Sequence, residues 1–127
     1  MSITYIAIVD DNRNLRNTLK EKLNQYNHYK VLFVAENGKD FLEAMREARL
    51  NIEPDVVLMD IDMPGLNGIE GLKLIRRSVP GVLVIMQTVF EDEDKIFEAV
   101  KSGAHGYFLK KTSPAKLIEG IRDVMEG

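Results

Sequence analysis

Five short apolar runs, separated by longer segments with helical spacing, constrain the fold of this chain more than any other feature. The runs are nearly continuous in apolar residues instead of alternating, which is typical of strands covered on both faces of a parallel sheet. They span residues 5–9, 31–35, 56–59, 82–86 and 107–109. The pattern therefore predicts five buried strands.

Each segment that follows a run has apolar residues three or four positions apart, which predicts an amphipathic helix. The five predicted stripes are Leu15, Leu19 and Leu23; Phe41, Leu42, Met45 and Ala48; Ile69, Leu72 and Ile75; Ile96, Phe97 and Val100; and Leu117, Ile121, Val124 and Met125. Ser113-Pro114 predicts the start of the fifth helix. Gly103 predicts the end of the fourth helix, and the acidic run 91–94 suits the helix dipole at its start.

The strand–helix order repeats five times, which predicts right-handed crossovers and helices on both faces of the sheet. The expected fold class is α/β: a flavodoxin-like, doubly wound, five-stranded parallel sheet of order 2-1-3-4-5 with five helices. With 127 residues, 45% of them hydrophobic, residues 1–127 are expected to form one domain.

Composition excludes several classes of function. The chain has no cysteine, so disulfides, thiolate metal sites and a cysteine nucleophile are ruled out. A formal net charge of -3 argues against direct binding of nucleic acid by this chain. No apolar run approaches the roughly 20 residues of a membrane span, and the first residues lack the features of a signal peptide. We therefore expect a cytoplasmic location and no membrane partner.

Charged side chains follow the predicted strands at the point where ligands bind in open α/β sheets. Asp10 and Asp11 follow the first run and Asp60 follows the third. The topological switch point lies between those two strands, so the three carboxylates should converge there. Three carboxylates cannot lie close together without a compensating positive charge, and Lys110 follows the fifth run.

This set of residue types suits phosphoryl transfer. Carboxylates without His or Cys favour a hard cation, with Mg²⁺ ahead of Ca²⁺. Lys110 can pair with a phosphoryl oxygen, and Thr88 offers a hydroxyl at the same edge. Such a reaction needs positioning and charge neutralisation more than covalent machinery. Asp60, at the centre of the set, is the best candidate for a nucleophile that forms an aspartyl-phosphate.

The ordered set of polar residues resembles the receiver domain of bacterial two-component response regulators over essentially the whole chain. The residues that carry the resemblance are Asp10-Asp11, Asp60 within DIDMPGLNG, Thr88, Tyr107 and Lys110. The resemblance implies a phosphorylation-activated signalling switch in which a sensor histidine kinase phosphorylates Asp60. Mg²⁺, or Mn²⁺ in its place, would be held by Asp10, Asp11, Asp60 and the backbone carbonyl of Asp62.

The resemblance also implies how the signal leaves the site. Thr88 and Lys110 would contact the phosphoryl group, and Thr88 and Tyr107 would act as the switch that changes the face formed by helix 4, strand 5 and helix 5. The protein would catalyse only its own phosphorylation and dephosphorylation. It would therefore not be an enzyme acting on other substrates.

The stretch GAHGYFLKKTSPAKL is most similar to regulators with a LuxR-like helix-turn-helix. It implies a role in transcription regulation through a C-terminal DNA-binding output domain outside this chain, and a homodimer on phosphorylation. Three positions depart from the family pattern: Val89 is larger than usual, Asp62 is acidic at the site entrance, and Lys111 replaces the usual proline. The last departure leaves the isomer of the Lys110–Lys111 bond open.

Two other functions compete with this interpretation. Asp60-Ile61-Asp62 matches the D-x-D of haloacid-dehalogenase-like phosphatases, which also form an aspartyl-phosphate, but those enzymes place it after their first strand. A flavin-binding module would need a phosphate loop after the first strand, where this chain has acids. Among the remaining residues, His28 and His105 are expected to be solvated loop residues, and Gly68 to free the backbone at the start of the third helix.

Overall fold

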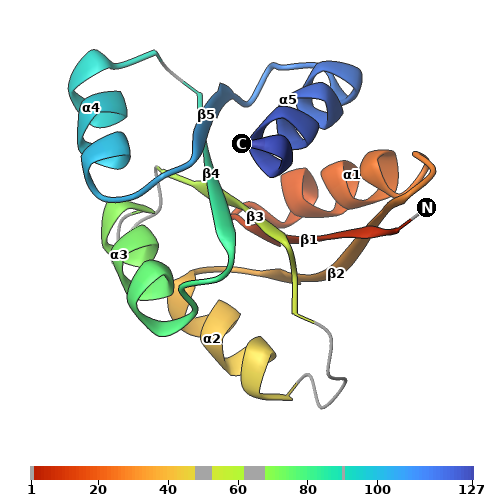
Figure 1. The fold of residues 1–127 in the computed structure, drawn as a ribbon, viewed down its shortest axis with the longest axis horizontal. Coiled ribbons are helices and arrows are strands. Elements are labelled where there is room, and N and C mark those ends of the chain that lie inside the picture. The colour runs from red at the N-terminus through yellow and green to blue at the C-terminus, as the bar shows by residue number, and fades with distance from the viewer. Residues whose placement is uncertain (1, 48–52, 62–67, 90) are drawn as a thin grey trace.

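The computed structural model describes residues 2–47, 53–61, 68–89 and 91–127. Its five strands form one parallel sheet in the order β2-β1-β3-β4-β5, as predicted (Figure 1). The strands are β1 (Thr4–Val9), β2 (Tyr29–Ala35), β3 (Val56–Asp60), β4 (Leu83–Thr88) and β5 (Gly106–Leu109). The helices are α1 (Arg13–Leu23), α2 (Gly38–Glu47), α3 (Gly68–Ser78), α4 (Glu93–Lys101) and α5 (Pro114–Glu126).

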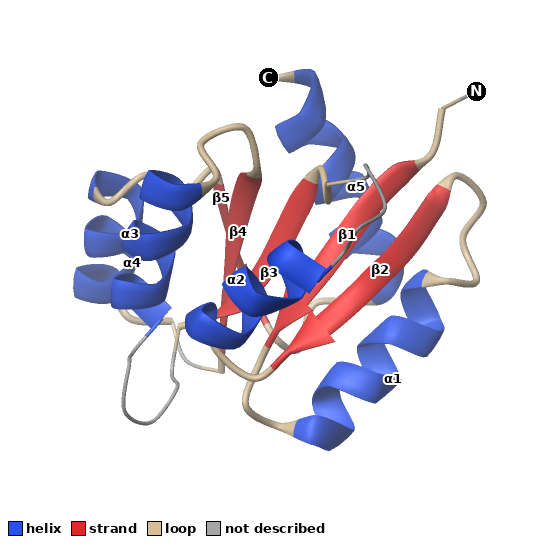
Figure 2. Cartoon of the chain, turned by 90° about the horizontal axis from the view of Figure 1, so that it is seen from below, coloured by secondary structure: helices blue, strands red, loops and turns tan. Residues whose placement is uncertain are grey.

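The helices cover both faces of the sheet and create two separate apolar layers. Helices α1 and α5 lie on one face, and α2, α3 and α4 on the other (Figure 1). Side chains of one strand alternate between the layers: Ile6 and Ile8 pack under α1 and α5, whereas Ala7 and Val9 pack under the other helices. Because all strands are parallel, their carboxyl ends share one edge of the sheet (Figure 2).

Two strands extend further at their carboxyl ends than the apolar runs predicted. β3 includes Asp60, and β4 includes Gln87 and Thr88, which the sequence had suggested would follow the strand. The pairing continues through these polar residues: Asp60 is in register with Gln87, and Thr88 with Leu109. Asp60 and Thr88 are therefore fixed by the sheet instead of by a loop.

Two of the predicted apolar stripes have a different phase in the structure. In α1, Leu15 is 44% exposed while Arg16 is only 8% exposed, so the buried face runs through Arg16 and Leu23. In α4, Phe97 and Val100 are 70% and 60% exposed, and the helix packs through the small side chain of Ala99. Of the other stripes, Met125 is exposed and Ala48 lies outside the described residues.

The predicted helix boundaries near the site are confirmed. The Ser113 hydroxyl caps α5 by accepting a hydrogen bond from the backbone N–H of Lys116, and Pro114 begins the helix. Gly103 follows α4 with φ of 106°, a left-handed conformation that favours glycine. Within the acidic run, Asp92 caps α4 by accepting from the backbone N–H groups of Asp94 and Lys95.

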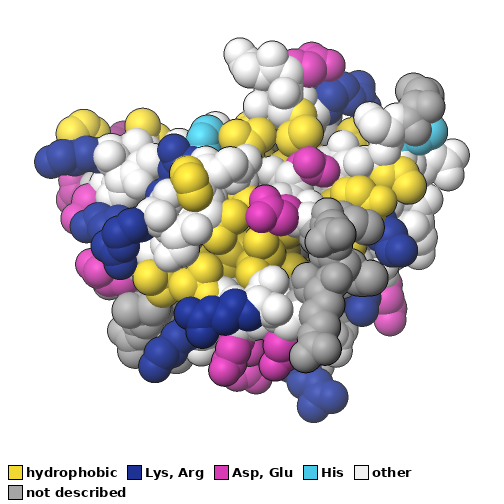
Figure 3. All heavy atoms as spheres, turned by 60° about the horizontal axis from the view of Figure 1, so that its bottom comes forward, with side chains coloured by type: hydrophobic (Ala, Val, Ile, Leu, Met, Phe, Trp, Pro, Cys, Tyr) yellow, Lys and Arg dark blue, Asp and Glu magenta, His cyan; other side chains and the backbone are white. Residues whose placement is uncertain are grey.

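Charges of both signs surround a group of hydrophobic side chains on the face seen in Figure 3. Lys and Arg side chains are interspersed there with Asp and Glu, in keeping with the small net charge of -3. Among the described helices, none is both long enough and apolar enough to span a bilayer.

His105 is exposed, as expected, but it has a structural contact that the sequence did not predict. Its Nδ1 accepts a hydrogen bond of 3.1 Å from the backbone N–H of Val84, and the backbone N–H of His105 donates to the Val84 carbonyl at 2.7 Å. An acceptor Nδ1 requires the neutral imidazole. Partial burial, with the positive charge of Arg76, lowers the pKa of His105 below its usual value of 6.5.

We predict that this contact makes stability depend on pH in the acidic range. The pKa of His105 is lower in the folded state than in the unfolded state. The imidazole contact therefore contributes fully to the free energy of unfolding above pH 6.5, and this contribution is lost as pH falls through the folded pKa. In thermal melts between pH 7.5 and 5, the Tm of His105→Asn should fall less than the Tm of wild type. The Asn amide oxygen can accept from the backbone N–H of Val84 and does not titrate. His28→Asn is the control. Equal pH slopes in wild type and His105→Asn would contradict the role of the imidazole.

Candidate functional site

The three carboxylates that the sequence singled out meet at the carboxyl edge of the sheet. Asp10 and Asp11 follow β1, and Asp60 ends β3, the strand beside it. One oxygen from each of the three lies within 4.8 Å of the others. Asp10 and Asp60 are 6% and 2% exposed, and Asp11 is exposed. The predicted convergence is therefore present, with two acids buried and one at the rim.

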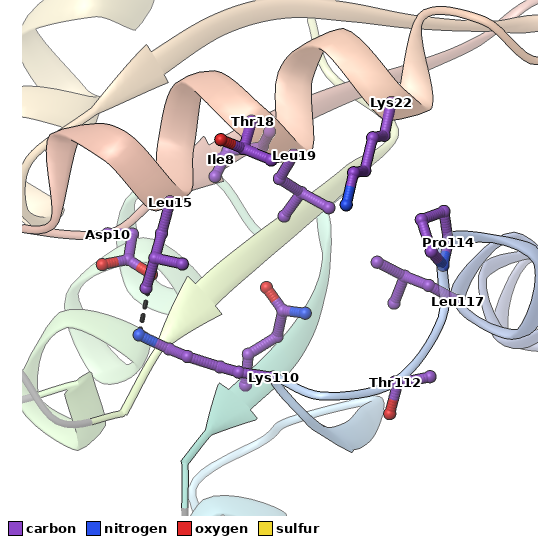
Figure 4. Close-up of a pocket in the computed structure, with 11 residues that line it drawn as sticks. Ile8, Asp10, Leu15, Thr18, Leu19, Lys22, Lys110, Thr112, Pro114 and Leu117 are labelled. Carbon is purple, nitrogen blue, oxygen red and sulfur yellow. Dashed lines mark ion pairs between the residues drawn. The ribbon is translucent and has the colours of Figure 1, made fainter.

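Lys110 supplies the compensating positive charge. Its Nζ lies 2.8 Å from Asp10 Oδ2 and 3.1 Å from Asp60 Oδ2. Figure 4 shows its side chain extending from the end of β5 towards Asp10. Burial acts to lower the pKa of Lys110, but the hydrogen bonds and charges of Asp10 and Asp60 outweigh it and raise that pKa above 10.5. Lys110 is therefore a firmly protonated cation shared by two buried carboxylates.

The backbone around Asp10 is held from several directions. The Asp10 N–H donates to the carbonyl of Ala35 at the end of β2, at 3.0 Å. Asp10 Oδ1 accepts from the backbone N–H of Asn12 at 2.9 Å. The Asn12 side chain in turn accepts from the N–H of Leu15 and caps α1. The loop that carries Asp10 and Asp11 therefore leads directly into the capped start of α1.

Arg16 is a site residue that the sequence analysis missed. Its Nη1 donates a hydrogen bond of 2.7 Å to the backbone carbonyl of Asp10, and its Nη2 lies 3.9 Å from Glu36 Oε1. The sequence did contain a signal: Leu19 and Leu23 lie three and seven positions after Arg16, which is the spacing of one helix face. The prediction placed Leu15 on that face instead, because Leu15 is apolar and also fits the spacing.

Thr88 and Tyr107 lie at the same edge but face the other layer. Thr88 is 1% exposed at the end of β4, and its backbone carbonyl accepts from the N–H of Lys110 at 2.7 Å. Tyr107 is half-buried, packs against the layer under α3 and α4, and has a buried hydroxyl oxygen. Alternation along β4 puts the Thr88 side chain on the side of Met86, the register partner of Tyr107.

The three departures from the family pattern have different outcomes. Asp62, expected to offer its backbone carbonyl to the metal, lies outside the described residues. The bond between Lys110 and Lys111 is trans, since the described part of the chain contains no cis peptide bond. Val89 is 56% exposed directly after Thr88, so its larger side chain lies at the rim.

A groove opens from the acidic cluster between α1 and α5. Leu15 and Leu19 line it from α1, Pro114 and Leu117 line it from α5, and Lys110 lies beside it (Figure 4). The groove places apolar side chains of α1 and α5 beside the charged site.

The family model for the response regulator receiver domain matches residues 6–122. This chain belongs to that family. It is a receiver domain of two-component systems, a signalling module that works as a phosphorylation switch. Nothing in the matches supports the phosphatase alternative.

Individual relatives agree with the family assignment. The receiver is 41% identical over 122 residues to the transcriptional regulatory protein LnrK of Bacillus subtilis, covering 96% of this chain and 54% of LnrK. It is 36% identical over 120 residues to the chemotaxis protein CheY of Halobacterium salinarum, covering 94% and 95% of the two chains. A DNA-binding response regulator of the LuxR family from Staphylococcus aureus has a similar structure, with a TM-score of 0.83, 30% identity and coverage of 96% and 98%. The receiver thus spans about half the length of LnrK.

Gly68 packs directly against the backbone of the central acid. A Cβ at this position would lie 2.4 Å from the Asp60 carbonyl oxygen and 2.4 Å from Ile61 Cα. The Gly68 N–H also donates to the Ile61 carbonyl at 3.0 Å. The sequence predicted that Gly68 frees the backbone at the start of α3. The structure shows that close approach to the Asp60–Ile61 backbone, and not a positive φ, is what requires glycine there.

We predict that Gly68→Ala destabilises the receiver by about 1–3 kcal/mol, because the new methyl group must displace the backbone of β3 or α3. Gly81→Ala is the matched control, since a Cβ there meets nothing within 4 Å. Urea unfolding of both variants measures the difference. Equal stability of the two would show that the contact at Gly68 relaxes without cost.

Proposed function

We propose that Asp60 accepts a phosphoryl group from a sensor histidine kinase in a Mg²⁺-dependent reaction. The observation that carries the proposal is the buried Asp60 carboxylate, with Asp10 and Asp11 beside it and Lys110 Nζ 3.1 Å from its Oδ2. This arrangement holds the Asp60 carboxylate and the Lys110 ammonium group in place before the phosphoryl group arrives. The groove between α1 and α5 supports a protein donor that approaches along those helices.

In the proposed step, a carboxylate oxygen of Asp60 attacks the phosphorus of a kinase phosphohistidine. The oxygen–phosphorus bond forms as the phosphorus–nitrogen bond breaks, and the departing imidazole nitrogen takes up a proton from solvent. Lys110 stays protonated and pairs with a phosphoryl oxygen, while Thr88 donates its hydroxyl to another. Attack of water on the same phosphorus later releases inorganic phosphate and restores the Asp60 carboxylate, so the receiver catalyses only these two reactions of its own side chain.

The acidic cluster fits a hard divalent cation. Three carboxylates with one oxygen each inside 4.8 Å, and no nitrogen or sulfur ligand among them, are the donor set that Mg²⁺ prefers over softer metals. We propose Asp10, Asp11 and Asp60 as its ligands, with the Asp62 carbonyl as a fourth and Mn²⁺ as a substitute. The ion supplies positive charge to the phosphoryl oxygens when it is bound.

We predict one phosphate adduct per chain on incubation with an acyl phosphate donor and Mg²⁺, and none when EDTA is present. Intact-mass measurement should show the adduct in wild type and no adduct in Asp60→Asn. Asp55→Asn is the control: Asp55 directly precedes β3, at the end away from Asp60, and its carboxylate accepts from the N–H of Tyr5. A phosphate adduct of normal yield in Asp60→Asn would place the acceptor elsewhere.

We further propose that phosphorylation changes the face formed by α4, β5 and α5. Thr88 would move towards the phosphoryl group, and Tyr107, which lies on the same layer, would follow into the space that Thr88 vacates. The hydroxyl oxygen of Tyr107 is already buried in this structure, so the layer under α3 and α4 has room for the end of the side chain. Phe97 and Val100 on α4 are the exposed apolar side chains that such a change would present to a partner.

We predict that Thr88→Ala separates phosphorylation from this output. Beryllofluoride with Mg²⁺ mimics the phosphoryl group, so amide chemical shifts can be compared with and without it. In wild type the shifts should extend from the loops around Asp60 to Tyr107 and α4. In Thr88→Ala the shifts around Asp60 should remain, and those at Tyr107 and α4 should shrink. Chemical-shift changes confined to the loops around Asp60 in wild type would contradict the proposed switch.

The wider biological setting is also a proposal. We propose that residues 1–127 form the receiver domain of a cytoplasmic transcription regulator, whose C-terminal DNA-binding output domain lies outside this chain. The similarity to LnrK and to LuxR-family regulators supports this arrangement. We propose a homodimer on phosphorylation, since charges of both signs accompany Phe97 and Val100 on α4. Neither nucleic acid nor a membrane is proposed as a direct partner of this domain.

A further inference from the structure

Arg16 is a buried cation that meets the acidic cluster at the Asp10 backbone carbonyl. The residue is 8% exposed; its Nη1 donates to the Asp10 carbonyl at 2.7 Å, and its Nη2 lies 3.9 Å from Glu36 Oε1. Its Nε is buried and has no hydrogen-bond partner among the residues that the structure describes. Burying a guanidinium with an unused donor is a poor way to stabilise a fold. The arrangement therefore needs an explanation other than stability.

The bond from Arg16 fixes one particular peptide group. The Asp10 carbonyl belongs to the peptide that joins Asp10 to Asp11, so its direction sets where the backbone of Asp11 lies. The Asp10 N–H is already held by Ala35 at the end of β2. With Arg16 on the carbonyl, the peptide groups on both sides of Asp10 are fixed, and the exposed Asp11 gains a defined position relative to the buried acids.

We propose that Arg16 is a positioning residue for the divalent cation, acting through the Asp10–Asp11 peptide to hold the two acids at metal-binding separation. This inference rests on the proposed Mg²⁺-dependent function of the site. Glu36, at the other end of the guanidinium, steadies the arginine from the end of β2. The start of α1 and the end of β2 are thereby tied to the geometry of the cluster.

Charge and position make opposite predictions for the loss of Arg16. As a positive charge near the cluster, Arg16 repels an incoming cation, so its removal should tighten Mg²⁺ binding. As the group that fixes Asp11, its removal should weaken binding, in the way that loss of an outer-shell partner weakens a metal site. The sign of the change therefore separates the two roles.

We predict that Arg16→Met weakens Mg²⁺ binding by about tenfold, measured by calorimetric titration of the folded protein. Arg13→Met is the matched control: it removes the same charge from an exposed position on α1 and should leave Mg²⁺ affinity unchanged or slightly tighter. With an acyl phosphate donor, Arg16→Met should need more Mg²⁺ for half-maximal phosphorylation, while the rate at saturating Mg²⁺ falls much less.

Arg16→Lys keeps the charge and the long stem but replaces the guanidinium fork by a single ammonium. It should bind Mg²⁺ more weakly than wild type and more tightly than Arg16→Met, and it carries the test alone if Arg16→Met does not fold. Affinity equal to or tighter than wild type in either folded variant overturns the inference. Wild type that binds Mg²⁺ but takes no phosphate on Asp60 overturns the proposed function instead.

Discussion

The ion pairs from Lys110 to Asp10 and Asp60 are the interaction on which the rest of the site depends. Two buried carboxylates and a third at the rim would repel one another at these separations, and a buried carboxylate without a partner is costly. Lys110 Nζ, at 2.8 Å and 3.1 Å from two of them, makes the cluster compatible with a folded protein. The lysine comes from the end of β5 and the acids from the ends of β1 and β3, and the parallel sheet in this strand order brings them together.

The same sheet explains how one site can have side chains in both of the layers that flank it. Asp60 and its register partner Gln87 point to the layer under α1 and α5, whereas Thr88 and Tyr107 point to the layer under α3 and α4. In the proposed mechanism, the kinase approaches the groove between α1 and α5, and Thr88 and Tyr107 carry the change towards α4 and β5. Because the Thr88 carbonyl also accepts the N–H of Lys110, the cation of the site and the proposed switch share one backbone hydrogen bond.

Sequence alone predicted the strand order and the convergence of Asp10, Asp11 and Asp60, because continuous apolar runs and chain order limit an α/β sheet to few arrangements. It did not predict that Arg16 is buried or that Phe97 is exposed, since helical spacing defines a stripe only to within one residue of rotation and packing decides the phase. The contact of Gly68 with the Asp60 backbone was also beyond the sequence, because close approach depends on tertiary packing.

The central claim is that one charged cluster binds the cation and the phosphoryl group together on Asp60. The most direct measurement is a high-resolution crystal structure of the receiver with Mg²⁺ and beryllofluoride. We predict the beryllium atom bound to an Asp60 oxygen, Lys110 Nζ against one of the fluorines, and a metal ion bound by Asp10, Asp11 and Asp60. A beryllofluoride adduct on another carboxylate, or a metal ion that contacts none of the three acids, would contradict it.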